Sequence, residues 1–285
     1  MADIYEVGIV GSGIMGAGLA EVAAKAGYHV VVRSRTMEGA DAVRAKLTSG
    51  LERQVAKEKL TADERDAILE RITTTDHLGR LAECDLVIES VVEDLAVKRA
   101  LFAELEQIVK PSGILATNTS TLPVVELAMA TQRPELVCGI HFFNPAPMMR
   151  LVEIVRPITA SDDTIQRAAM FAERCGKDAI TVEDRAGFVV NALLFPYLNN
   201  AIRMWEHGTA SMEDIDTAMQ GGCNFPMGPF ALLDLVGLDT SLAILEALYE
   251  EFRDANFAPA TTLRRMVAAG RLGRKTGAGF YEYGS

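Results

Sequence analysis

The glycine-rich segment at residues 11–16, Gly-Ser-Gly-Ile-Met-Gly, constrains the fold of this chain more than any other feature. It follows a short apolar run at residues 7–10 and precedes a strong helical pattern at residues 17–26. The three glycines permit a tight turn, close backbone approach to a pyrophosphate and close packing of helix on strand. A helix N-terminus also offers unpaired N–H groups to phosphates. We therefore predict a dinucleotide site, with a purely structural glycine turn as the alternative. The expected contacts are Gly11, Gly13, Ile14, Met15 and Gly16.

Apolar runs alternate with helical patterns over the first two thirds of the chain. Such alternation predicts an α/β fold with a doubly wound, mostly parallel sheet of the Rossmann type. Between the second and third runs, apolar residues recur every four positions from Val43 to Val55, and Thr61 begins a capping-box pattern. These two helices lengthen the crossover and could reach over a ligand. The runs lie at residues 7–10, 30–32, 86–92, 113–116, 137–143, 151–155 and 179–182.

Strand patterns stop after residue 186, which predicts a second, all-helical domain. A long helix is expected over residues 187–205, Ser211 can cap the next, and prolines at 226 and 229 precede another at residues 230–236. We predict a dinucleotide-binding domain over residues 1–184 and a substrate-binding and dimerisation domain over residues 185–285. The apolar side chains expected to form a homodimer surface are Leu193, Leu194, Phe195, Tyr197, Leu198, Met204 and Trp205.

Composition excludes several classes of function. A net charge of −11 argues against a sequence-independent nucleic-acid binder. Four widely spaced cysteines favour reduced thiols over a disulfide framework or a zinc site, and four histidines without an HExxH motif favour no metal. No apolar run approaches the roughly 18 residues of a membrane span, and a strand pattern begins almost directly after Met1. We therefore expect a cytoplasmic protein that contacts neither membrane nor nucleic acid.

His141 and Glu153 form the candidate proton-transfer pair. His141 lies near the end of the apolar run 137–143, Glu153 lies in the middle of the run 151–155, and a proline-rich turn separates them. Adjacent strands joined by a short turn could bring the two side chains together. A carboxylate bonded to one imidazole nitrogen fixes the tautomer and leaves the other nitrogen free to move a proton. The alternative is a core histidine satisfied by a nearby acceptor.

The end of the second strand indicates which dinucleotide binds. An NAD-specific site places a carboxylate there to accept hydrogen bonds from the ribose 2′-OH. This chain has Ser34 and Arg35 instead, and a hydroxyl with a guanidinium suits a 2′-phosphate. We predict that NADP(H) is preferred and that NAD(H) remains possible. The alternative is a solvated loop with incidental arginines.

Seven motifs occur in order and at family spacing. In these motifs the chain resembles the (S)-3-hydroxyacyl-CoA dehydrogenase family, and within it the short bacterial 3-hydroxybutyryl-CoA dehydrogenases. The resemblance covers essentially the whole length of the chain. The family usually has an acid at position 34, so the departure there bears on cofactor choice and not on the reaction. Arg150 stands where a lysine is common and preserves the charge. The motifs lie at residues 11–16, 93–98, 118–120, 141–147, 187–191, 226–229 and 275–280.

The resemblance implies a role for each catalytic position. His141 would be the general base for the 3-hydroxyl proton, and Glu153 would orient it. Ser120 would hydrogen-bond the reacting oxygen and contact the cofactor, and Asn191 would bond the thioester side of the substrate. Ser120 could instead only cap a helix, and Asn191 could be a surface amide. The further positions corresponding to cofactor contacts are Glu93, Lys98, Asn118, Asn144 and Lys275.

Lys57 and Lys59 lie on the predicted helical pair and could meet the phosphates of coenzyme A, but an ordinary charged helix face is the favoured alternative. The resemblance thus implies hydride transfer between NADP(H) and a 3-hydroxyacyl or 3-oxoacyl thioester, with 3-hydroxybutyryl-CoA and acetoacetyl-CoA as the first choice. One alternative is a relative acting on a carrier-protein-bound acyl group or a sugar acid. Another is a non-catalytic, crystallin-like nucleotide-binding protein.

Overall fold

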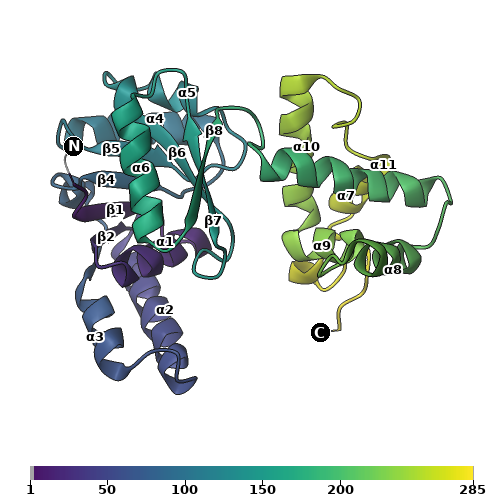
Figure 1. Cartoon of the computed structure of the whole chain (residues 1–285), viewed down its shortest axis with the longest axis horizontal. Coiled ribbons are helices and arrows are strands. Elements are labelled where there is room, and N and C mark those ends of the chain that lie inside the picture. Colours follow the sequence, from purple (N-terminus) through teal and green to yellow (C-terminus); the bar gives the residue numbers. More distant parts are fainter. Residues whose placement is uncertain (1–2, 285) are drawn as a thin grey trace. The chain divides into compact units, whose positions relative to one another are not determined.

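The computed structural model describes residues 3–284, and its backbone separates into two compact units, Met1–Asp184 and Arg185–Ser285. Each unit has its own layers of secondary structure (Figure 1). The first is an α/β unit built on one sheet, and the second is helical. The predicted fold class is therefore confirmed.

The sheet of the first unit has eight strands in the order β3-β2-β1-β4-β5-β6-β7-β8. All neighbouring pairs are parallel except β6 and β7, which pair antiparallel. The order from β3 to β6 is that of a doubly wound dinucleotide-binding sheet, whose ligands lie beyond the carboxyl ends of the strands. The strands are β1 (Glu6–Val10), β2 (His29–Arg33), β3 (Ile72–Thr75), β4 (Leu86–Glu89), β5 (Ile114–Thr117), β6 (Val137–Phe142), β7 (Leu151–Arg156) and β8 (Asp178–Glu183).

Two strand predictions need correction. Strand β3 was not predicted, because Ile-Thr-Thr-Thr carries one strongly apolar residue and no alternating pattern. Strand β4 ends at Glu89, three residues before the end of the predicted run at residue 92. There the backbone N–H of Val91 donates to the carboxylate of Glu89, so the chain leaves the sheet.

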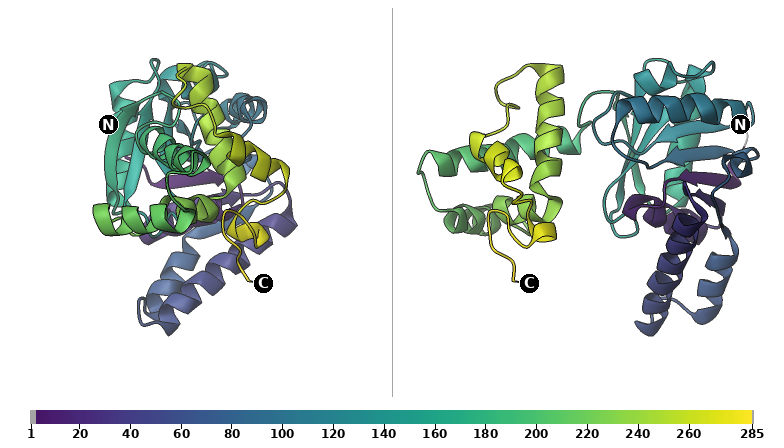
Figure 2. Two further views of the ribbon diagram at one scale, coloured as in Figure 1. Left: turned by 90° about the vertical axis from the view of Figure 1, so that its right-hand side faces the viewer. Right: turned by 180° about the vertical axis from the view of Figure 1, so that it is seen from behind.

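Helices cover both faces of this sheet. Helices α1 and α6 pack on one face, and α4 and α5 pack on the other, which faces the viewer in the right panel of Figure 2. The main core lies between the sheet and the α1–α6 layer and is built from strand valines and isoleucines with alanines of α1. The helices of this unit are α1 (Ile14–Lys25), α2 (Met37–Ala56), α3 (Ala62–Glu70), α4 (Leu95–Ile108), α5 (Val124–Ala128) and α6 (Asp162–Arg174), with 3-10 turns η1 (Leu78–Leu81) and η2 (Pro134–Leu136).

Helices α2 and α3 form the predicted helical pair and extend away from the sheet (Figure 1). The hydroxyl of Thr61 accepts from the backbone N–H of Glu64, whose carboxylate accepts from the N–H of Thr61, which confirms the capping box. In the last turn of α2, Gln54 donates to Glu21 of α1, and Lys25 donates to both residues. This cluster fastens the pair to α1.

The second unit packs its helices around its own core. Helix α7 begins at Val190, three residues after the predicted start, because Gly187 and Phe188 have φ values of 71° and 46° that a right-handed helix cannot contain. The only strand-like pairings described within residues 185–284 are isolated bridges near the end of the chain. The helices are α7 (Val190–Glu206), α8 (Met212–Cys223), α9 (Pro229–Val236), α10 (Leu238–Phe252) and α11 (Thr261–Ala268), with a 3-10 turn η3 (Arg274–Thr276).

Part of the predicted dimer surface lies inside this core instead. Phe195 and Leu198 are 2% and 0% exposed, because they face the other helices of the same unit. Leu193 and Met204, on the same helix α7, are 72% and 47% exposed. The apolar helix therefore divides into a buried face and an outward face.

No helix within residues 3–284 has both the length and the apolarity needed to cross a membrane. All four cysteine thiols are free. Burial raises the pKa of Cys84 and of Cys138 to about 12, so neither side chain is a ready thiolate nucleophile.

Candidate active site

His141 and Glu153 are directly opposite each other in the antiparallel ladder of β6 and β7. The Nδ1 atom of His141 lies 2.8 Å from Oε2 of Glu153, and the two residues are 4% and 0% exposed. Because the carboxylate is the acceptor, Nδ1 carries the proton and Nε2 presents its lone pair. The ring of Phe143 lies 4.5 Å from the imidazole, centroid to centroid, and limits its movement.

Ser120 completes a chain of three polar side chains. Its Oγ lies 3.1 Å from Nε2 of His141, on the side of the ring opposite Glu153. Ser120 follows strand β5, which is adjacent to β6, so both side chains lie at the carboxyl edge of the sheet. Helix α5 begins only at Val124, and its N-cap residue is Pro123, so Ser120 does not cap that helix.

A half-exposed carboxylate holds the backbone beneath Ser120. Oε1 of Glu93 accepts from the backbone N–H of Ser120 at 3.0 Å and from the hydroxyl of Thr119. On the other side, Oδ1 of Asn118 accepts from the backbone N–H of Phe142 at 2.8 Å. Asn118 therefore ties the Ser120 turn to the strand that carries His141.

Lys98 does not face solvent. Its side chain is 1% exposed, and Nζ lies 2.7 and 2.8 Å from the two carboxylate oxygens of Glu89 and 3.3 Å from Glu93. Glu89 also accepts from the hydroxyl of Thr117 and from the backbone N–H of Val91. One buried ion pair thus joins β4, β5, α4 and the loop that carries Glu93.

Asn144 lies in the exposed turn between β6 and β7. Two features outside the turn hold it in place. The ammonium of Lys177 donates to the carbonyl oxygens of Ala146 and Met149 at 2.7 and 2.8 Å. A Cβ on Gly18 of α1 would lie 3.2 Å from Cβ of Ala146, so the turn packs closely on that helix.

The glycine turn fits a pyrophosphate. Gly13 is the N-cap of α1 and makes no side-chain hydrogen bond to the first helical turn, which leaves N–H groups for an anion. A Cβ on Gly11 would lie 2.3 Å from the carbonyl oxygen of Ser90, and one on Gly16 would lie 2.0 Å from that of Gly11. Ile14 is exposed and Met15 half-buried beside them.

Ser34 follows β2 immediately and reaches the same turn. Its Oγ lies 2.9 Å from Oγ of Ser12, and the residue is 5% exposed. Gly39 provides the space, because a Cβ there would lie 2.2 Å from the Ser34 hydroxyl. Arg35 is exposed.

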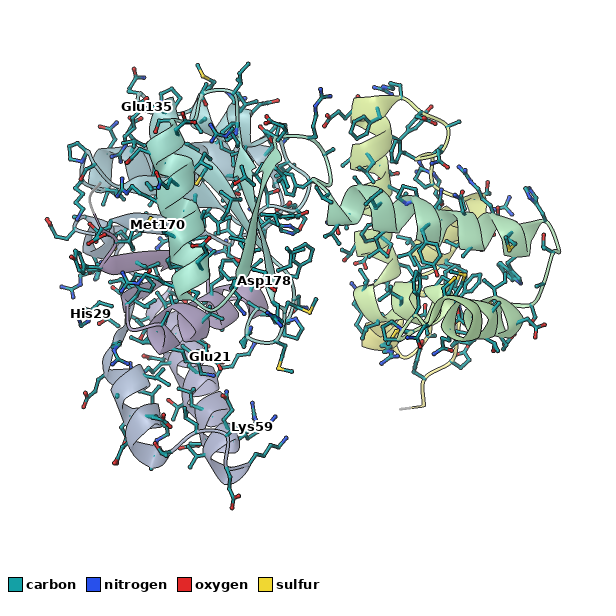
Figure 3. The ribbon with its side chains drawn as sticks, viewed as in Figure 1. Glu21, His29, Lys59, Glu135, Met170 and Asp178 are labelled. Carbon is teal, nitrogen blue, oxygen red and sulfur yellow. The ribbon has the colours of Figure 1, made fainter. Side chains whose placement is uncertain are left out.

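The remaining predicted residues lie away from this edge or in the second unit. Lys57 and Lys59 are exposed at the far end of the helical pair, where Figure 3 labels Lys59. Within the second unit, Asn191 is 8% exposed in the first turn of α7, and Nζ of Lys275 lies 2.6 Å from Oδ1 of Asp239. Across residues 3–284 no group of acidic, histidine or cysteine side chains is arranged to hold a metal ion.

Two family models match the chain in sequence. The model described as "3-hydroxyacyl-CoA dehydrogenase, NAD binding domain" matches residues 6–185, and "3-hydroxyacyl-CoA dehydrogenase, C-terminal domain" matches residues 187–283. The chain belongs to the 3-hydroxyacyl-CoA dehydrogenase family. It is an enzyme of that family, and its first unit is the NAD-binding domain.

Individual relatives agree over their whole length. A 3-hydroxybutyryl-CoA dehydrogenase of Mycobacterium tuberculosis is 48% identical, over 99% of this chain and 100% of the relative. A probable 3-hydroxybutyryl-CoA dehydrogenase of Bacillus subtilis is 42% identical, over 99% of this chain and 98% of the relative. The solved (S)-3-hydroxybutyryl-CoA dehydrogenase from Ralstonia eutropha superposes with a TM-score of 0.97 at 42% identity, covering 99% of this chain and 100% of that one.

Three residues that support the site of this dehydrogenase were missed from sequence. Glu89 ends an apolar strand, where a carboxylate is unusual, and that was a sequence signal for it. Lys177 precedes β8 and resembles any lysine in a turn. Asp184 accepts from the backbone N–H groups of Val124 and Val125 at 2.9 and 2.7 Å, an N-terminal cap supplied from about sixty residues away, which no local pattern indicates.

Proposed function

We propose that this enzyme transfers a hydride between NADP(H) and a 3-hydroxyacyl or 3-oxoacyl thioester, with 3-hydroxybutyryl-CoA and acetoacetyl-CoA as its substrates. The observation that carries the proposal is the Ser120–His141–Glu153 chain of hydrogen bonds at the same sheet edge as the glycine turn. The names of the relatives support the acyl chain length and the coenzyme A handle.

The protein supplies the proton chemistry. In the oxidising direction, Nε2 of His141 would take the proton of the 3-hydroxyl group. The dinucleotide, which the glycine turn at Gly11, Gly13 and Gly16 would hold, would supply the acceptor for the hydride of C3. Ionised Glu153 stabilises the imidazolium that forms, an interaction strongest in the transition state. Ser120 donates to the reacting oxygen and holds it on the Nε2 side. Glu153 is 0% exposed, and its Oε2 lies 2.8 Å from Nδ1 of His141, so the carboxylate faces the ring and not the solvent.

The remaining ligand contacts are proposed from the resemblance to the family. Glu93, Asn118 and Asn144 would contact the cofactor, and Lys98, which is buried, would act through Glu93. Asn191 and Lys275 of the second unit would meet the thioester and the cofactor, respectively, and Lys57 with Lys59 the phosphates of coenzyme A. The outward face of α7, which includes Leu193, would form the homodimer contact.

An assay of NADPH oxidation tests the proposed substrate against its alternatives. Acetoacetyl-CoA, its carrier-protein thioester, longer 3-oxoacyl-CoAs and free sugar acids are compared side by side. The highest kcat/KM is expected with acetoacetyl-CoA. Activity only on carrier-bound acyl groups or sugar acids would replace the proposed substrate, and failure with every compound would contradict the proposed substrate class.

Cofactor preference is tested by Ser34→Asp. The wild-type enzyme is expected to have the higher kcat/KM with NADPH, because no carboxylate repels a 2′-phosphate and the exposed Arg35 can pair with it. Since Ser34 is turned toward Ser12, its main contribution is the absence of charge. The substitution is expected to shift the ratio of kcat/KM values toward NADH by roughly 10- to 100-fold, the size of one charge-assisted interaction.

Ser12→Ala is the matched control, because it removes the partner hydroxyl and adds no charge. It is expected to change both kcat/KM values in the same proportion. A wild-type preference for NADH would contradict the NADP(H) assignment directly, and the hydride-transfer reaction itself would be unaffected by that result.

A further inference from the structure

Three charged side chains form a connected group behind Ser120. Glu89 and Lys98 are fully buried and bonded to each other, whereas the side chain of Glu93 is 42% exposed. The group holds two carboxylates and one ammonium, which gives a formal net charge of −1. Its exposed end is Glu93, which bonds the backbone N–H of Ser120.

The sheet order places this exposed end beside the path of the cofactor. The glycine turn follows β1, Glu93 follows β4, Ser120 follows β5, and His141 lies at the end of β6, and these four strands are consecutive neighbours. A dinucleotide with its pyrophosphate on α1 and its reacting ring at His141 must cross the ends of β4 and β5. The ring of a cofactor bound in this way would therefore lie close to the Glu93 carboxylate.

The reacting ring changes charge during turnover, because the oxidised nicotinamide is a cation and the reduced ring is neutral. A nearby net negative charge binds the oxidised form more tightly relative to the reduced form. If Lys98 were not already paired, its ammonium would cancel the charge of Glu93. Glu89 prevents this, since both its oxygens bond Nζ of Lys98 more closely than Glu93 does.

We propose that Glu89 is a positioning residue that neutralises Lys98, so that Glu93 keeps a net negative charge toward the nicotinamide and sets the relative affinity for the oxidised and reduced cofactor. This inference rests on the proposed dinucleotide site. It differs from a purely structural role, in which Glu89 only joins β4 to β5 through the hydroxyl of Thr117.

The test compares the Kd of the oxidised and the reduced cofactor in binding titrations without substrate. The formal net charge is −1 in the wild type, 0 in Glu89→Gln and −1 again in the double variant Glu89→Gln/Lys98→Met. The ratio of Kd for the oxidised form to Kd for the reduced form is expected to rise roughly tenfold in Glu89→Gln, the effect of one unit charge across several ångströms of protein. It is expected to return toward the wild-type ratio in the double variant.

Glu104→Gln, an exposed carboxylate on the same helix α4, is the matched control and is expected to leave the ratio unchanged. Equal weakening of both forms in Glu89→Gln, or a double variant further from wild type than the single one, would overturn the inference. If Glu89→Gln does not fold, Glu93→Gln replaces it, because that variant also has a formal net charge of 0 while the buried pair of Glu89 and Lys98 stays intact. An unchanged Kd ratio in Glu93→Gln would overturn the inference equally. A wild-type protein that binds neither form would contradict the proposed function instead.

Discussion

Replacement of His141 by glutamine is expected to lower kcat by about 10²- to 10⁴-fold, the usual contribution of a positioned general base. Glutamine can still bond Glu153 and Ser120 in place of the ring nitrogens, but it cannot take a proton from the 3-hydroxyl group. Because His141 lies at the far end of the site from the glycine turn, the Kd for NADPH is expected to remain nearly unchanged. Steady-state kinetics and cofactor titration measure the two quantities separately.

His77→Gln is the matched control, since the side chain of His77 is 83% exposed and lies outside the site. It is expected to retain wild-type kcat. Loss of NADPH binding in His141→Gln, together with a lower unfolding temperature, would mean that His141 is a core histidine whose role is structural.

Gly16→Ala is expected to weaken dinucleotide binding strongly. The added Cβ would lie 2.0 Å from the carbonyl oxygen of Gly11, so either the glycine turn or the start of α1 must move. If two hydrogen bonds from the helix N-terminus to the pyrophosphate are lost, at about 1.5–3 kcal/mol each, the affinity falls by roughly 10²-fold or more. Fluorescence titration with NADPH measures the loss.

Gly50→Ala provides the comparison on helix α2, because a Cβ there would meet no atom within 4 Å. That substitution is expected to leave binding unchanged and to stabilise the protein slightly, since alanine favours helix over glycine. Wild-type affinity in Gly16→Ala would show that the turn does not hold the phosphates.

The sequence predicted most of the fold because its strongest patterns are local. The apolar strand before the glycine turn, the four-residue spacing in α2 and the capping box of α3 each depend on neighbours within a few positions. Strand β3 was missed because its three threonines are stabilised by pairing with β2 and carry little apolar signal. The start of α7 was misplaced because the left-handed conformation of Phe188 has no composition signature.

The site residues likewise divide into those that local sequence patterns predict and those that depend on distant contacts. The pairing of His141 with Glu153 was predictable from two apolar runs and a short turn, and the ladder register places them opposite each other. The partners of Lys98 were not predictable, because its ammonium is buried only by the packing of α4 on the sheet. Likewise, Lys177 donates to carbonyl groups more than twenty-five residues away. Every residue has a backbone carbonyl, so the sequence does not indicate which ones accept.

The antiparallel register of β6 and β7 has a consequence for how this enzyme can diverge. His141 and Glu153 are held by the ladder itself and Phe143 packs on the imidazole, so the seven residues between Phe143 and Leu151 can change in sequence, or in length, without moving the proton-transfer pair. The same turn contains Asn144 and the exposed Met148. A descendant of this chain could therefore acquire a different ligand preference through this one turn while its chemistry stays intact, and exchanging the turn between relatives is a direct route to new specificities.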